Sequence, residues 1–102
     1  MEPFSLLLLA ICATIAVGVT FLTISMIRDY VREKRSVKSA KAASAILKRK
    51  LESGEYEVNV GFWEDGEFSD VQQWKAEDVD DTIKGLREGK VIFDREPEPI
   101  RH

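Results

Sequence analysis

An uncharged, strongly apolar run from Phe4 to Ile27 most constrains what this chain can fold into. As one helix, these 24 residues would extend roughly 36 Å at about 1.5 Å per residue, which is enough to cross a hydrocarbon core of about 30 Å. A cluster of basic residues follows directly, starting at Arg28. The sequence therefore predicts an N-terminal transmembrane helix over residues 1–27.

A cleaved secretory signal is the main alternative for this run. Such a signal has a positively charged start and an apolar stretch of only about 7 to 15 residues. This chain starts Met1-Glu2-Pro3, without Lys or Arg, and its apolar run is longer. Cys12 is the one cysteine, so it has no partner for an internal disulfide, and we interpret it as a membrane-buried thiol. We therefore expect an uncleaved single span.

Charge is divided unevenly along the rest of the chain. Residues 28–50 hold nine basic and two acidic residues, a net charge of +7, whereas residues 51–102 hold six basic and fifteen acidic residues, a net charge of −9. Basic residues beside a span stay on the cytoplasmic side. The predicted topology is single-pass, with the N-terminus outside and the C-terminal domain cytoplasmic.

Small residues recur within the predicted span. Ala10, Thr14 and Gly18 are spaced by four and would lie on one helix face, where they would let a second helix approach closely. This face predicts helix–helix packing, either with another copy or with a different membrane protein. An ordinary lipid-facing surface is the alternative.

Residues 28–54 are predicted to form a basic juxtamembrane helical stalk, because neither Pro nor Gly interrupts the segment before Gly54. Two interpretations of this stalk remain open. One is a short coiled coil with a seam at Val37, Ala40, Ser44, Leu47 and Leu51. The other is a helix on the inner leaflet, with anionic lipids contacting Arg35, Lys38, Lys41, Lys48, Arg49 and Lys50.

Residues 55–95 are predicted to form a small acidic α+β domain with a ββαβ order. Apolar residues alternate from Tyr56 to Phe62, and Asp65-Gly66 is a strong hairpin signal. The expected cross-strand pairs are Glu64 with Glu67, Trp63 with Phe68, Val60 with Val71, and Glu57 with Trp74.

A helix over residues 76–88 and a third strand over residues 90–93 complete this predicted domain. Residues 69–75 could instead begin the helix earlier, with Ser69 as its N-cap. The stripe Val79, Ile83 and Leu86 would pack on the sheet face of Val58 and Val60. Residues 96–102 are predicted to be a disordered tail, since they are polar and interrupted by proline.

The expected hairpin register leaves three large rings on the other sheet face, namely Trp63, Phe68 and Trp74. Exposed aromatic groups are favoured anchors of protein interfaces, so these rings are predicted to bind a partner. If the register is off by one residue, or if the middle segment is helical, some of these rings are simply core.

The sequence contains no arrangement typical of catalysis, metal binding or a cofactor, and no motif of a known family. Its acidic residues between Glu77 and Asp81 suit a helix N-terminus better than a calcium loop. We therefore expect a non-enzymatic single-pass membrane protein whose cytoplasmic domain binds a protein partner, as an accessory subunit or a tethering or regulatory factor. The alternative is a self-oligomerising, membrane-active lysis or membrane-remodelling protein. Membrane lipids are expected partners, and nucleic acid is not.

Overall fold

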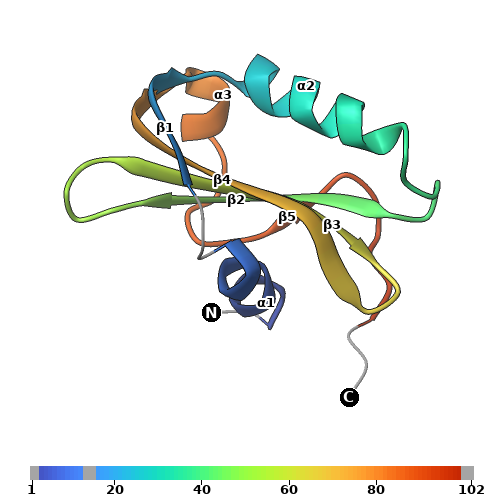
Figure 1. The fold of residues 1–102 in the computed structure, drawn as a ribbon. Helices are drawn as coiled ribbons and strands as arrows, with labels where there is room; N and C mark the ends of the chain where they lie inside the picture. Colours follow the sequence, from blue (N-terminus) through green and yellow to red (C-terminus); the bar gives the residue numbers. More distant parts are fainter. Residues whose placement is uncertain (1–2, 13–15, 100–102) are drawn as a thin grey trace.

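The computed structural model describes residues 3–12 and 16–99. Within these residues, five strands form one mixed sheet in the order β1-β4-β3-β2-β5. The elements are α1 (Pro3–Cys12), β1 (Ala16–Leu22), α2 (Ile24–Arg35), β2 (Ala43–Lys50), β3 (Tyr56–Glu64), β4 (Glu67–Val79), α3 (Asp81–Lys84) and β5 (Ile92–Phe93). β1 runs parallel to β4, and the other neighbours are antiparallel. Figure 1 shows α2 across one face of the sheet and α1 beneath the other.

The N-terminal apolar run is not a single helix. It is divided among α1, β1 and the start of α2. None of the helices in the described part of the chain is both long enough and apolar enough to cross a bilayer. The predicted transmembrane helix over residues 1–27 is therefore wrong, and so is the single-pass membrane localisation with a cytoplasmic domain that was derived from it.

Local chemistry explains where the run breaks. β1 contains three β-branched residues and one glycine, which favour a strand over a helix interior. Thr23 then has an extended backbone and caps α2, with its side-chain oxygen accepting a hydrogen bond from the Met26 N–H. The fold buries Leu8, Leu22 and Ile27 of this run, while other large apolar residues of it, such as Leu6 and Phe21, stay exposed.

The predicted helical stalk over residues 28–54 is also wrong, because α2 ends at Arg35 and residues 43–50 form β2. Every residue of β2 has a partner in β3. The side chains of Ala45 and Leu47 are buried on the α1 side of the sheet, while Ile46 contacts the core on the other side. Sheet pairing on both edges of β2 thus overrides the helix propensity of its Ala, Leu and Lys residues.

The hairpin between β3 and β4 confirms the sequence prediction at its turn. Asp65 and Gly66 both have positive φ, 55° and 81°, as expected for the two central residues of a type I′ turn. The confirmed cross-strand pairs are Glu64 with Glu67 and Trp63 with Phe68.

Farther from the turn, a bulge changes the register of the hairpin. Asp70 has a φ of 48°, and the ladder shifts between Val60 and Phe62. Val60 therefore pairs with Gln72 rather than with Val71. A slip of one residue moves a strand's side chains to the opposite face of the sheet. Trp74 therefore lies on the same face as Val58 and Val60, opposite to the face that was expected.

The predicted ββαβ order is also wrong in its second half. β4 continues to Val79, and α3 is a single short turn of helix capped by the Asp80 side chain. Val79 and Ile83 nevertheless pack with Val58 and Val60, as the apolar stripe predicted. The last strand, β5, is only two residues long and pairs with β2.

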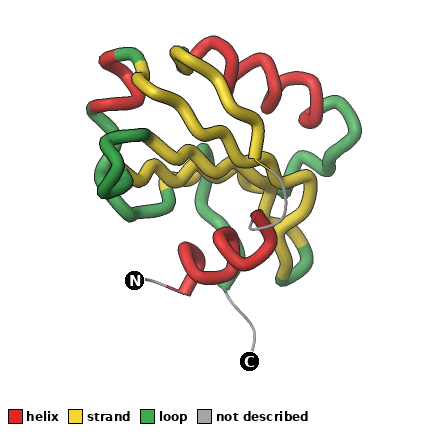
Figure 2. Tube along the Cα trace, turned by 60° about the vertical axis from the view of Figure 1, so that its left-hand side comes forward, coloured by secondary structure: helices red, strands yellow, loops and turns green. Residues whose placement is uncertain are grey.

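The sheet separates two apolar clusters, and Figure 2 shows helices on both of its sides. The cluster under α1 consists of Leu8, Ala43, Ala45, Leu47, Trp63, Phe68 and Val91. The cluster under α2 and α3 consists of Leu22, Ile27, Val58, Val60, Trp74, Ala76, Val79 and Ile83. Residues of the predicted span thus supply part of both cores.

The basic segment, residues 28–50, and the acidic segment, residues 51–102, pair with each other in the fold. Four ion pairs join them: Arg35 with Asp94, Lys38 with Asp70, Lys48 with Glu88, and Arg49 with Glu57. The Lys48 ammonium is almost fully buried and also donates to the Lys84 carbonyl at 3.1 Å. The charge separation seen along the sequence therefore becomes local charge balance between neighbouring elements.

Part of the predicted disordered tail lies against the hairpin. The Trp63 indole N–H donates to the Glu98 carbonyl at 3.0 Å, and the Gly66 N–H donates to the Glu98 carboxylate at 2.9 Å. Glu98 is therefore held against the β3–β4 hairpin, while residues 100–102 lie outside the described part of the chain.

Candidate functional site

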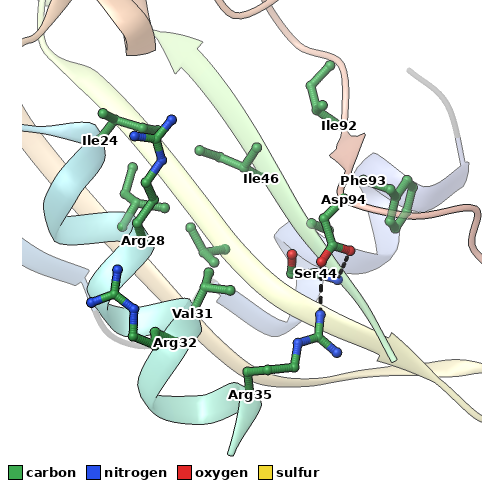
Figure 3. A pocket seen from close by; sticks show the side chains of 13 residues that line it. Ile24, Arg28, Val31, Arg32, Arg35, Ser44, Ile46, Ile92, Phe93 and Asp94 are labelled. Atoms are coloured by element: carbon green, nitrogen blue, oxygen red, sulfur yellow. Dashed lines mark hydrogen bonds and ion pairs between the residues drawn. The ribbon is translucent and has the colours of Figure 1, made fainter. Parts of the chain in front are cut away.

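A groove lies between α2 and the sheet edge formed by β2 and β5 (Figure 3). Its volume is about 380 Å³, which falls within the range of about 300–1,000 Å³ that is usual for binding pockets. Phe93 adds a ring, and six of the thirteen lining residues are large aliphatic ones: Ile24, Ile27, Val31, Ile46, Val60 and Ile92. The groove therefore offers a mainly apolar surface.

The groove exists because α2 is anchored toward β4 rather than over the middle of the sheet. The Tyr30 ring packs edge-on against Trp74, with 5.5 Å between ring centroids. Its hydroxyl donates to the Asp70 carbonyl at 2.5 Å. These contacts hold α2 on the β4 side, so the part of the same sheet face formed by β2 and β5 is left uncovered.

The amphipathic sequence of α2 gives the groove its positive rim. Ile24, Ile27 and Val31 line the apolar side, and Arg28 and Arg32 line the rim. Arg32 forms an ion pair with Asp29 at 3.2 Å, but both side chains are strongly exposed, so water screens the pair. Arg28 has no carboxylate within 4 Å among the described residues. Both guanidinium groups are therefore accessible to an anion.

An ion pair between Arg35 and Asp94 crosses one end of the groove at 3.0 Å (Figure 3). Arg35 also donates to the Ala42 carbonyl at 2.6 Å, and Asp94 accepts from the Ser44 N–H at 2.8 Å. This pair therefore ties α2 to the segment that follows β5.

The same contacts keep Asp94 ionised. Burial acts to raise the pKa of Asp94, but hydrogen bonds from Ser44 and the charges of Arg95 and Arg35 outweigh burial and leave that pKa below its ordinary value. Asp94 is thus a fixed carboxylate that orients Arg35 and not a proton donor at neutral pH.

The three rings predicted to bind a partner are buried. Trp63, Phe68 and Trp74 are 1%, 5% and 8% exposed. Trp63 and Phe68 pack with Phe4 under α1, whereas Trp74 packs with Tyr30 under α2. The expected cluster of exposed rings on one face is therefore absent from the described surface, and the alternative, that these rings are core, is correct.

The predicted helix–helix packing residues do not share one helix. Ala10 lies in α1 and Gly18 lies in β1, while Thr14 lies outside the described residues. Their four-residue spacing therefore has no common face in this fold.

The predicted lipid-contact residues are also divided among elements. Arg35 ends α2, Lys38 and Lys41 lie in the loop after it, and β2 contains Lys48, Arg49 and Lys50. Four of the six form ion pairs with acidic residues. The single basic helical surface expected from the sequence is not formed.

Sequence reasoning missed Arg28 and Arg32 as site residues. A signal was present, because Ile24, Ile27 and Val31 repeat at helical spacing beside these arginines. This helical pattern crosses Ile27, where the predicted membrane span ends. Its first part was therefore assigned to the span and its second part to the stalk.

Within residues 3–12 and 16–99, no three His, Cys, Asp or Glu side chains come together as a possible metal site. Comparisons of the chain with protein-family models, curated proteins and solved structures found no match. The groove is therefore interpreted from its own geometry and charge.

Proposed function

We propose that this chain is a non-catalytic binding domain whose groove receives an acidic, apolar segment of a partner protein. One observation carries the proposal: Arg28 and Arg32 line the groove together with its aliphatic residues. An aliphatic lining favours apolar side chains, because their burial removes surface from water. Guanidinium groups favour carboxylates, which they hold by charge-assisted hydrogen bonds.

The shape of the groove supports a chain segment as the occupant. Val31, Ile46 and Ile92 are only half-buried, so the groove is open to solvent along these residues. The α2 wall from Ile24 to Arg35 is about 16 Å long at about 1.5 Å per residue. About five residues of an extended peptide match this length.

The charges of the groove support an acidic occupant. The lining contains Arg28, Arg32 and Arg35 against one carboxylate, Asp94, among the described residues. Asp94 is already paired with Arg35, so the two remaining guanidinium groups would attract acidic side chains and repel basic ones.

Fluorescence anisotropy with two labelled peptides tests the proposal. One six-residue peptide alternates leucine and glutamate, and the matched peptide alternates leucine and lysine. The glutamate peptide should bind the full chain, more weakly as salt rises, and the lysine peptide should not. The charge reversal R28E/R32E should weaken binding of the glutamate peptide at least about tenfold, or about 1.4 kcal/mol, and should favour the lysine peptide.

The matched control is R87E/K90E, which makes the same change in net charge at two exposed residues outside the groove. This control should bind the glutamate peptide as the wild-type chain does. The proposal would be contradicted if the glutamate peptide bound R28E/R32E as tightly as it binds the wild-type chain, or if it did not bind the wild-type chain. Binding of decanoate without binding of either peptide would also overturn it, in favour of a small amphiphile.

A further inference from the structure

β1 forms one edge of the sheet, and no strand of the described residues pairs with its outer side. In an edge strand, outward N–H and C=O groups are available to another chain. Proteins usually protect such edges with charges, prolines, bulges or very short strands. The seven residues of β1 carry no charge and no proline, and their register with β4 is regular.

The opposite edge differs in its length and in the charges beside it. β5 is only two residues long and is followed by the charged residues Asp94 and Arg95. The Arg95 guanidinium contacts the Ala40 carbonyl, and the Asp94 N–H donates to the Ser44 carbonyl. The sheet is thus protected at β5 and open at β1.

Two large apolar side chains are exposed on β1. Val17 is 42% exposed and Phe21 is 49% exposed. They lie on the same face, because side chains alternate along a strand. Val19 is the midpoint of Ala16–Leu22, so Val17 and Phe21 stand symmetrically on either side of it.

From this symmetry we infer that two copies of the chain pair through β1, antiparallel and around a two-fold axis at Val19. All seven residues of each strand then find a partner, and Val17 lies opposite the partner's Phe21 at both ends. Side chains that are directly opposite have Cβ atoms about 4.5–5.5 Å apart, so each exposed apolar group covers the other. The two sheets become one continuous sheet.

A second copy suits this edge for two further reasons. A charged strand would repel itself in such a pair, whereas β1 is neutral along its whole length. A two-fold arrangement also closes on itself, so pairing stops at two chains. The groove between α2 and β5 lies toward the other edge of the sheet and stays open, so this inference is independent of the proposed function.

Molecular mass in solution, measured by light scattering on a sizing column, tests the inference. The wild-type chain should have twice the 11.6 kDa mass of one chain. V17K/F21K should have the mass of one chain, because the register places like charges opposite each other. V17E/F21K should restore the double mass, because the same register then places opposite charges together at both ends.

A mixture of V17K/F21K and V17E/F21E should likewise form a complex of two chains, although each alone has the mass of one. V37K is the matched control, because Val37 is 77% exposed in the loop after α2, and it should keep the double mass. If V17K/F21K does not fold, V17T/F21T places a residue of high strand propensity at both positions and should weaken the dimer about tenfold. A wild-type mass of one chain, a double mass for V17K/F21K, or a single-chain mass for V17E/F21K would overturn the inference.

Discussion

The carboxylate of Asp80 accepts a hydrogen bond from the backbone N–H of Ile24 at 2.7 Å, although 56 residues separate the two. The same carboxylate accepts from the Ile83 N–H at 3.0 Å, and the Asp80 N–H donates to the Leu22 carbonyl at 3.1 Å. One residue thus joins the start of α2 to the start of α3. Since α2 forms one wall of the groove, Asp80 fixes the position of that wall.

Replacing Asp80 should therefore loosen the fold in a pH-dependent way. The N–H groups of Ile24 and Ile83 lower the pKa of Asp80 in the folded chain. The stabilisation is present above the unfolded pKa of about 3.9 and is lost as pH falls through the folded pKa. D80N should have a lower Tm than wild type at pH 7, and the gap should shrink below about pH 4. Glu52 is exposed, so E52Q serves as the control. A difference in Tm between D80N and wild type that stays constant from pH 7 to pH 3, or an equally large difference between E52Q and wild type, would contradict this role.

Trp63 should be a major contributor to stability. Its indole is 1% exposed and packs against Phe4 and Phe68, with ring centroids 5.0 and 4.9 Å away. W63A should lower the free energy of unfolding by about 3–5 kcal/mol in urea titrations. L6A, at a residue that is 57% exposed, should change it by less than about 0.5 kcal/mol. An unchanged free energy of unfolding in W63A would show that the ring is not core.

The bulge at Asp70 predicts an unusual order of stability among substitutions. Its positive φ of 48° suits glycine, whereas alanine is strained there by about 1 kcal/mol or more. D70G should therefore be more stable than D70A by roughly 1 kcal/mol in urea titrations. Both variants lose the Lys38 ion pair, so the comparison isolates the backbone. Equal stability of D70G and D70A would mean that the bulge relaxes when the side chain is removed.

A disulfide can test the parallel pairing of β1 with β4. Gly18 lies opposite Lys75, and a Cβ at Gly18 meets nothing within 4 Å. In a C12S background, G18C/K75C should form an intramolecular disulfide on mild oxidation, because neighbouring strands lie about 4.8 Å apart. G18C/E67C, with its second cysteine at the far end of β4, should not. Free thiols in G18C/K75C after oxidation would contradict the placement of β1.

The sequence predicted the parts of the fold that depend on neighbouring residues. Asp65-Gly66 specifies its turn locally, so the first pairs of the hairpin were correct. The bulge at Asp70 was not predictable, because it is held by residues distant in sequence: Tyr30 bonds the Asp70 backbone carbonyl, and Lys38 pairs with its carboxylate. That single shift moved Trp74 to the other face and removed the predicted ring cluster.

The larger errors arose where composition allows more than one environment. The run from Phe4 to Ile27 is apolar, but its sequence does not distinguish a membrane span from elements that a two-sided sheet core buries only in part. Likewise, Ala43 to Lys50 has helical composition, and only pairing with β3 and β5 makes it a strand. Arg28 and Arg32 became candidate site residues only after α2 was placed beside β2. Tertiary contacts therefore decided both the architecture and the groove.

Methyl NMR of isoleucine tests the proposed binding groove most directly. Ile24, Ile27, Ile46 and Ile92 line the groove, whereas Ile11 and Ile83 do not. Titration with the leucine–glutamate peptide should shift the methyl signals of the four groove residues and leave those of Ile11 and Ile83 in place, and R28E/R32E should suppress the shifts. Shifts at Ile11 and Ile83 equal to those in the groove, or no shift at Ile46 and Ile92, would contradict binding at this site.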